Sequence, residues 1–235
     1  MVPELAMTLD HPAIARLAEA SRKVDLVCGT VLRSNDFQYF NAAIHLHAGE
    51  VAHVHRKVYL PTYGMFDEQR YFADGDRVRM YEVDGIRHGI LVCEDMWHLS
   101  TSYLLAVQGV HVLTCISASP GRGVLAHAAD DDLRSVAAWD GLCRTVAEYT
   151  TCYVVYCNRL GYEDGVNFHG GSSVHGPDGR KLLDAEEERG LVSVEIDMRE
   201  VQRQRVATPL LADERVDFTL RELRRIVDEQ VDGPY

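Results

Sequence analysis

A cysteine ends one of the apolar segments of the chain, at a point where a reactive side chain could act. Cys93 closes the segment 85–93, and the carboxylates of Glu94 and Asp95 follow it directly. Reactive groups of α/β folds lie where strands end, and a thiol is an effective nucleophile when a base or a cation promotes loss of its proton. We therefore predict that Cys93 is a nucleophile. The remaining cysteines are interpreted as inert, mostly buried thiols: Cys28, Cys115, Cys143, Cys152 and Cys157.

A lysine has the corresponding place after another segment of strand character. Lys57 ends the segment 51–57, and residues 60–79 after it show no periodicity and are rich in Pro, Gly, Tyr and charge. Long loops of this kind often carry functional residues. A solvated surface lysine is the ordinary alternative. Two reactive side chains that each end a strand and precede an acid-rich stretch favour a shared site instead.

The elements that must position these side chains alternate along the chain. Apolar, β-branched segments and 3.6-residue periodicity separate the strands from the helices. Strands are predicted at 24–32, 41–47, 51–57, 85–93, 110–116, 152–158, 170–175 and 191–196, with a Pro177-Asp178-Gly179 turn between the last two. Helices are predicted at 11–23, 102–108, 131–150, 199–205 and 219–230. Residues 41–57 form a hairpin pattern, so we expect a mixed sheet. Without repeats or linkers, residues 1–235 are predicted to be one α/β domain, with a solvated loop at 186–188.

Charge and composition exclude several classes of protein. Aspartate and glutamate number 36 against 24 lysines and arginines, which gives a net charge of −12. Proteins that bind nucleic acids or membrane surfaces need a basic surface instead. Apolar residues make up 46% and charged residues 26%, an ordinary globular composition. The sequence has no run of membrane-spanning length, no signal-peptide pattern and no C-x-x-C motif. We predict a cytoplasmic protein that binds neither nucleic acid nor membrane.

Four histidines flank the predicted hairpin turn and offer a competing site. His45, His47, His53 and His55 all occupy odd positions. With a three-residue loop, His45 would pair with His55 and His47 with His53, on one face. Four imidazoles could bind Zn²⁺ or Ni²⁺. Lys57 would lie on that same face, and no carboxylate or cysteine joins the cluster in sequence. A polar hairpin face is therefore the interpretation we favour, and no metal is predicted.

Two long motifs surround the two reactive side chains. They read RKVYLPTYG-x-FDE-x-RYF at 56–72 and VCED-x-W at 92–97, followed by SASP at 117–120, NR at 158–159 and GGSS at 170–173. In this order, over most of the chain, they resemble the nitrilase (carbon–nitrogen hydrolase) superfamily. Within it they are similar to the glutaminase domains of glutamine-dependent NAD synthetases and their stand-alone relatives. The two long motifs are specific, and we do not expect both by chance.

The resemblance implies a four-layer α-β-β-α sandwich with mixed sheets and a Glu–Lys–Cys catalytic set. Cys93 would attack an amide carbon and form a thioester. Lys57 would stabilise the tetrahedral oxyanion, with the backbone N–H of Glu94 as a second donor, and such donors contribute roughly 3–4 kcal/mol each. Glu68 matches a second glutamate that orients the lysine or transfers protons. The resemblance also implies contact with substrate for Tyr63, Trp97 and Ser119, beside the backbone of Glu94. For Tyr63 and Trp97 the alternative is a place in the pocket wall or the core.

The general base of the family is a glutamate in a Pro-Glu-Leu motif at the end of an early strand. The segment Val2–Leu5 offers those letters, but no apolar strand precedes it, and Glu4 lies 57 − 4 = 53 residues before Lys57, a shorter interval than usual. We favour the interpretation that the first strand, first helix and base-bearing second strand lie upstream of Met1. The alternative is that Glu4 is the base. Since general-base catalysis contributes about 10²–10⁴-fold, we expect this chain alone to be inactive or nearly so.

We predict a cofactor-free hydrolase that cleaves a non-peptide carbon–nitrogen bond of a small amide, glutamine-like or an ω-amide, and releases ammonia. The SGG-x-DS motif is absent from the sequence, so the chain would not make NAD itself but could supply ammonia to a separate synthetase. The resemblance leads us to expect at least a homodimer of the complete protein. The predicted helix 219–230 has an apolar stripe that packs either on its own domain or on a second subunit. The alternative function is a catalytically incomplete remnant that acts as an interaction or oligomerisation module.

Overall fold

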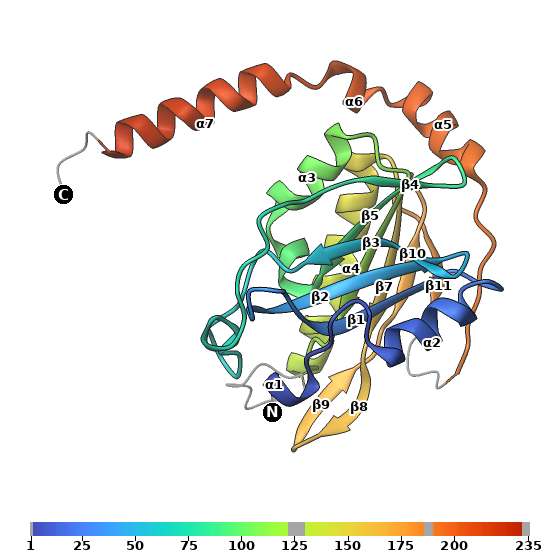
Figure 1. The fold of residues 1–235 in the computed structure, drawn as a ribbon. Helices are drawn as coiled ribbons and strands as arrows, with labels where there is room; N and C mark the ends of the chain where they lie inside the picture. The colour runs from blue at the N-terminus through green and yellow to red at the C-terminus, as the bar shows by residue number, and fades with distance from the viewer. Residues whose placement is uncertain (1, 122–129, 186–189, 232–235) are drawn as a thin grey trace.

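The computed structural model describes residues 2–121, 130–185 and 190–231 (Figure 1). A first, antiparallel sheet has the strand order β1-β2-β3. Its strands are β1 (Leu26–Arg33), β2 (Tyr39–His47) and β3 (Glu50–Arg56). A second sheet has the order β11-β10-β7-β6-β5-β4. Its strands are β4 (Tyr81–Val83), β5 (Ile86–Val92), β6 (Val112–Ser117), β7 (Tyr153–Asn158), β10 (Ser173–His175) and β11 (Lys181–Asp184).

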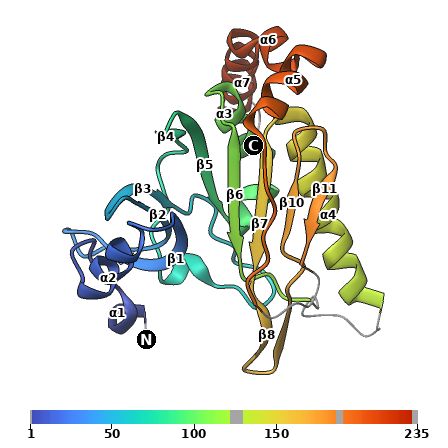
Figure 2. The same cartoon turned by 90° about the vertical axis from the view of Figure 1, so that its right-hand side faces the viewer.

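The second sheet is mixed, as the sequence predicted. Strands β5, β6 and β7 run parallel at its centre, and the flanking strands pair antiparallel. Parallel strands bring their carboxyl ends to one edge, where α/β proteins gather reactive groups. A small ribbon of β8 (Leu160–Glu163) and β9 (Val166–His169) extends from that edge (Figure 2).

Helices cover the outer face of each sheet. The helix α2 (Pro12–Ala20) buries Ile14 and Ala18 against the first sheet. The helices α3 (Leu99–Val107) and α4 (Asp130–Thr150) pack their apolar faces on the second sheet. Between the sheets lie Ala43, Ile90 and Val92. The layers therefore run α-β-β-α (Figure 2), which confirms the predicted four-layer sandwich with mixed sheets.

A glycine allows α3 to approach the strand that leads to Cys93. A Cβ atom at Gly89 of β5 would lie 2.7 Å from Cδ1 of Leu105, closer than van der Waals contact permits. The missing side chain therefore lets the helix pack directly onto the strand. The strand end that carries the candidate nucleophile is thus fixed from its outer face.

The strand predicted at 191–196 is wrong. These residues have no regular structure, and Leu191, Val194 and Ile196 are exposed, Leu191 to 98%. Their apolar alternation is typical of a strand, but the edge beside β10 is occupied by β11, which the sequence did not predict. An alternating pattern forms a strand only where a neighbouring edge can pair with it.

Several boundaries also differ from the predictions. The Pro177-Asp178-Gly179 turn closes the β10–β11 hairpin, with Gly179 at φ +77°. The strand predicted at 170–175 is shorter, because Gly170 and Gly171 have positive φ. The strands β4, β8 and β9 were not predicted. The expected loop at 186–188 lies outside the described residues, as does the part of the loop before α4 at 122–129.

The C-terminal segment begins on the second sheet, where Val201 is buried against Val112 and Tyr153, and then leaves the sandwich. It consists of α5 (Met198–Ala207), α6 (Leu210–Asp213) and α7 (Val216–Val231), and α7 extends away from the body of the domain (Figure 1). At the other end, α1 (Val2–Leu5) precedes Met7, whose backbone pairs with Leu32 of β1. Among the helices of the described residues, none has the length and apolar character needed to cross a membrane.

Candidate functional site

Cys93 lies at the point where β5 ends and a short 3-10 turn (Cys93–Trp97) begins. Its φ is +47°, a left-handed conformation that costs free energy for a residue with a side chain. Strain of this kind persists only where the surrounding structure enforces it. The half-buried thiol is thus presented on a sharp turn at the carboxyl edge of the central sheet.

Lys57 directly follows β3 and is almost completely buried, with 1% of its surface exposed. Its Nζ donates to Oε1 of Glu68 at 2.7 Å, and Nδ2 of Asn41 donates to Oε2 of the same carboxylate at 3.2 Å. Its backbone N–H donates to the carbonyl of Asn41 at 2.8 Å. Both oxygens of Glu68 are therefore engaged in holding the ammonium in one position. A buried, oriented ammonium is a strong electrostatic group because water does not screen it.

The charges around the thiol act in opposite directions. Burial raises the pKa of Cys93 above its ordinary value, and the nearby carboxylates of Glu68 and Glu94 act in the same direction. The ammonium of Lys57 and the hydroxyl of Ser117 lower that pKa in part. The structure therefore brings the predicted Cys93, Lys57 and Glu68 together. Because the pKa stays raised, the thiol needs a proton acceptor to react at neutral pH.

A buried carboxylate ties the two strand ends together. Asp95 is fully buried, and its Oδ1 accepts the backbone N–H groups of Val58 and Tyr59, each at 2.9 Å. Its Oδ2 accepts the N–H of Val92 at 3.1 Å and contacts Nε2 of His55 at 2.8 Å. One side chain thus binds the residues on both sides of Lys57 and the residue before Cys93. From the sequence, Asp95 was interpreted only as part of an acidic turn. A sequence pattern does not show which backbone groups a carboxylate accepts hydrogen bonds from.

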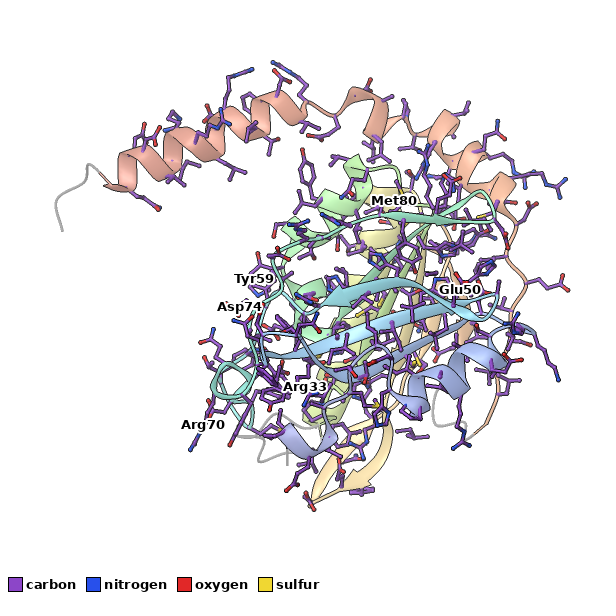
Figure 3. The ribbon with its side chains drawn as sticks, viewed as in Figure 1. Arg33, Glu50, Tyr59, Arg70, Asp74 and Met80 are labelled. Carbon is purple, nitrogen blue, oxygen red and sulfur yellow. The ribbon has the colours of Figure 1, made fainter. Side chains whose placement is uncertain are left out.

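The loop between β3 and β4 folds back onto the end of β3. The N–H of Gly75 donates to the carbonyl of Lys57 at 2.8 Å. A Cβ atom on Gly75 would lie 2.1 Å from the carbonyl oxygen of Arg56, so glycine is required there. Figure 3 labels Tyr59 and Asp74 at the same margin of the domain. The loop that carries Glu68 is thereby anchored at the strand end that carries Lys57.

Tyr63 and Glu94 form one side of the site. The Tyr63 hydroxyl donates to Oε2 of Glu94 at 2.7 Å, and burial together with the Glu94 carboxylate raises the pKa of Tyr63. The phenol therefore stays protonated and remains a donor. The Tyr63 residue is 59% exposed, whereas the Glu94 side chain is only 14% exposed. The two predicted contact residues thus lie together, with a polar group turned toward the thiol end of β5.

Trp139, which was not predicted as a site residue, contacts both Ser119 and Trp97. The indole N–H of Trp139 donates to Oγ of Ser119 at 2.8 Å, and the rings of Trp97 and Trp139 meet edge to face with centroids 5.1 Å apart. The backbone N–H of Ser119 donates to Oδ1 of Asn158 at 2.8 Å. Trp139 lies within α4, where no motif marked it. Asn158 belongs to a motif that supports the family resemblance, but its hydrogen bond with the backbone of Ser119 was not predicted.

The histidines of the β2–β3 hairpin do not pair as predicted. His45 lies opposite His53, and His55 lies opposite Ala43, because a bulge and a tight turn shift the register. His45 and His47 both bind Asp25, at 3.2 and 2.8 Å. The described residues contain no group of three or more His, Cys, Asp or Glu side chains that could hold a metal ion. The hairpin therefore gives no support for the metal alternative.

Glu4 belongs to the short helix α1 and its residue is exposed. The charged groups that act most strongly on Cys93 are Lys57, Glu68 and Glu94. Since Glu68 and Glu94 are held by Lys57 and Tyr63, neither is free to move to the thiol without breaking a hydrogen bond.

Comparison with known proteins adds an independent line of evidence. Residues 2–206 match the family model described as carbon–nitrogen hydrolase. The chain is 31% identical to a glutamine-dependent NAD(+) synthetase of Thermotoga maritima, over 83% of this chain and 33% of the relative. It is 28% identical to the 2-oxoglutaramate amidase of Bacillus subtilis, over 92% and 79%. A carbon–nitrogen hydrolase from Helicobacter pylori has a similar structure, with a TM-score of 0.81 and 26% identity over 88% and 74% of the two chains. The chain spans 33% of the length of the NAD(+) synthetases from Thermotoga maritima and Aquifex aeolicus.

Proposed function

The chain belongs to the carbon–nitrogen hydrolase family, and on that basis we propose that it hydrolyses a small amide through a thioester on Cys93. The family match confirms the resemblance inferred from the sequence motifs. The observation that supports the proposed chemistry is the meeting of a strained strand-end thiol with a buried ammonium. Cys93 has a φ of +47°, and the Lys57 side chain is 1% exposed and acts on the thiol.

The proposed reaction follows from these groups. The sulfur of Cys93 bonds to the amide carbon as the thiol proton passes to a general-base carboxylate other than Glu68 and Glu94, which are held by Lys57 and Tyr63, and the carbonyl oxygen becomes an oxyanion. Lys57 and the backbone N–H of Glu94 stabilise that oxyanion. The amide nitrogen takes up a proton and leaves as ammonia, and water then hydrolyses the thioester. Since both oxygens of Glu68 already accept hydrogen bonds, we assign Glu68 to orienting Lys57.

The substrate we propose is an ω-amide or a glutamine-like amide, and no cofactor takes part. The carboxylate of Glu94, the phenol of Tyr63 and the indole of Trp97 suit a short polar chain. The relatives include enzymes named glutamine-dependent NAD(+) synthetase and 2-oxoglutaramate amidase. The ammonia would pass to a separate synthetase. A cytoplasmic location stays a prediction from the sequence.

A panel of amides tests this function. Glutamine, other ω-amides, N-carbamoyl amines and nitriles are incubated with the purified chain, with Cys93→Ala and with Cys157→Ala, which removes an exposed thiol of β7. Ammonia released from ω-amides, lost in Cys93→Ala and kept in Cys157→Ala, is the result that the function predicts. Such turnover would overturn the expectation that this chain alone is inactive, and its loss in Glu4→Gln would make Glu4 the base.

Two further outcomes separate the alternatives. No ammonia, but acylation of Cys93 by a p-nitrophenyl ester, would show an intact nucleophile and a failed proton transfer, because this leaving group needs no proton. Neither ammonia nor acylation would contradict the enzyme and favour the interaction module.

We also propose that the protein forms a homodimer through α7. Its apolar stripe is exposed, at 48%, 56%, 42% and 57% for Leu220, Leu223, Ile226 and Val227. Contiguous exposed apolar surface of this kind usually marks a contact with another chain.

Light scattering after size-exclusion chromatography measures this assembly. We expect a dimer for the wild type and a monomer for Leu223→Glu, because a buried unpaired carboxylate is unfavourable. Arg224→Glu, which changes the charge of an adjacent position, should stay dimeric. A wild-type monomer, or a dimeric Leu223→Glu variant, would contradict the role of α7.

A further inference from the structure

A serine of β6 lies beside the candidate nucleophile. The register pairs Val92 of β5 with Ile116 of β6, and Ser117 with Asn158 of β7. Cys93, the next residue after Val92, therefore meets Ser117 at the carboxyl edge of the parallel strands. The Ser117 hydroxyl acts directly on the Cys93 thiol and lowers its pKa, in opposition to burial.

Two buried hydroxyl groups near Cys93 have no role in the proposed reaction. Oγ of Ser117 and the phenol oxygen of Tyr156 are both buried, and neither has a hydrogen-bond partner within the described part of the chain. Tyr156 is 2% exposed, and its ring stacks on Trp139 with centroids 4.5 Å apart. A buried donor without a partner is unfavourable. Such a group in a folded protein points to a partner that is present in another state of the site.

The neighbouring polar groups do not supply that partner. Asn158 is fully engaged, since its Nδ2 donates to the carbonyl of Gly170 at 2.8 Å and its Oδ1 accepts from Ser119. Burial raises the pKa of Tyr156, and the Ser117 hydroxyl acts on that phenol as well. Tyr156 thus remains a donor, and Ser117 lies between the phenol and the thiol.

We propose that Ser117 is a catalytic residue that donates a hydrogen bond to the Cys93 thiolate, and that Tyr156 is a positioning residue that donates to Ser117. In the resting thiol both donors are unsatisfied. When the Sγ–H bond breaks and the proton passes to the base, the sulfur anion accepts the O–H of Ser117, and charge-assisted bonds of this kind are the strong ones. Lys57 then supplies charge, and Ser117 a directed hydrogen bond. This inference deepens the proposed function, on which its catalytic meaning rests.

The rate of alkylation by iodoacetamide, followed across pH at Cys93 by peptide mass spectrometry, tests the pair without any substrate. In Ser117→Ala the apparent pKa of Cys93 should rise by about one pH unit or more, because a hydrogen bond to a charged group is lost. Tyr156→Phe should give a smaller rise, and Ser117→Thr, which keeps the hydroxyl, should restore the wild-type profile. Ser102→Ala removes another buried, unpartnered hydroxyl, on α3, and should leave the profile unchanged.

Thermal unfolding separates this role from a structural one. Because the Ser117 hydroxyl has no partner in the resting state, its removal should leave the melting temperature unchanged or higher. An unshifted or lowered pKa of Cys93 in folded Ser117→Ala would overturn the inference. A shifted pKa in a chain that neither hydrolyses amides nor is acylated by the p-nitrophenyl ester would uphold the thiolate donor and contradict only the proposed function.

Discussion

Replacing Lys57 with methionine is expected to slow the acylation of Cys93 by a p-nitrophenyl ester about 10²–10³-fold, the usual effect of removing one oxyanion donor. Methionine keeps an unbranched side chain of similar length and loses the charge. Lys57 is 1% exposed and held at 2.7 Å from Glu68, so its ammonium acts on the reaction without screening by water. The variant also loses the charge that lowers the pKa of Cys93, which acts in the same direction.

The matched control is Lys23→Met, at an exposed position after α2. Stopped-flow release of p-nitrophenolate measures the acylation rate of both variants. An equal rate for Lys57→Met and Lys23→Met would show that the buried ammonium has no part in the reaction. Glu68→Gln, which keeps the shape of the side chain but replaces one accepting oxygen with an NH₂ group and removes the negative charge, should lie between the wild type and Lys57→Met.

Replacing Asp95 with alanine is expected to lower the free energy of unfolding by about 3–5 kcal/mol, as the loss of one partner of a buried, hydrogen-bonded charge does. The variant leaves the N–H groups of Val58, Tyr59 and Val92 without their acceptor. It also leaves His55 unpaired in the interior, where the two side chains are almost fully buried. Since Asp95 joins the residues around Lys57 to the residue before Cys93, acylation should slow in parallel.

Urea denaturation measures the free energy of unfolding, with Asp76→Ala as the control. Asp76 lies in the same loop region, and its side chain is 70% exposed, so its removal should have little effect. Asp95→Asn should be intermediate, because its amide oxygen can still accept two N–H groups while its NH₂ group faces the N–H of Val92. An equal free energy of unfolding for Asp95→Ala and Asp76→Ala would contradict the role of Asp95 in holding the two strand ends together.

Much of the fold could be predicted because most elements follow a simple periodicity. The parallel strands at the centre of the second sheet read as apolar runs, and the long helix α4 has helical spacing from 131 to 150. These patterns arise because buried positions are occupied by apolar residues, so the spacing of apolar residues shows which face of an element is buried. The segment 191–196 shows where the rule fails. It has the right alternation, yet it pairs with no strand in the described part of the chain, and no local pattern reveals that β11 already takes the place beside β10.

Some residues of the candidate site could be predicted from the sequence, and others could not. Cys93, Lys57 and Glu68 could be predicted because each stands in a specific motif, and the structure brings them together. Trp139 and Asp95 could not, because their roles depend on which atoms meet across elements. The histidine pairs were predicted wrongly, since a two-residue turn in place of the expected three-residue loop, together with one bulge, shifts the partners along the hairpin.

The role of Cys93 as the nucleophile is tested most directly by the site of acylation with p-nitrophenyl acetate, mapped by mass spectrometry of the intact and digested chain. The six cysteines include Cys157, which is exposed, and Cys93, which is half-buried at a strained turn. We expect one acetyl group per chain, on Cys93, and none on the Cys93→Ala variant. Acetylation of the more exposed Cys157 before Cys93 would contradict this role of Cys93.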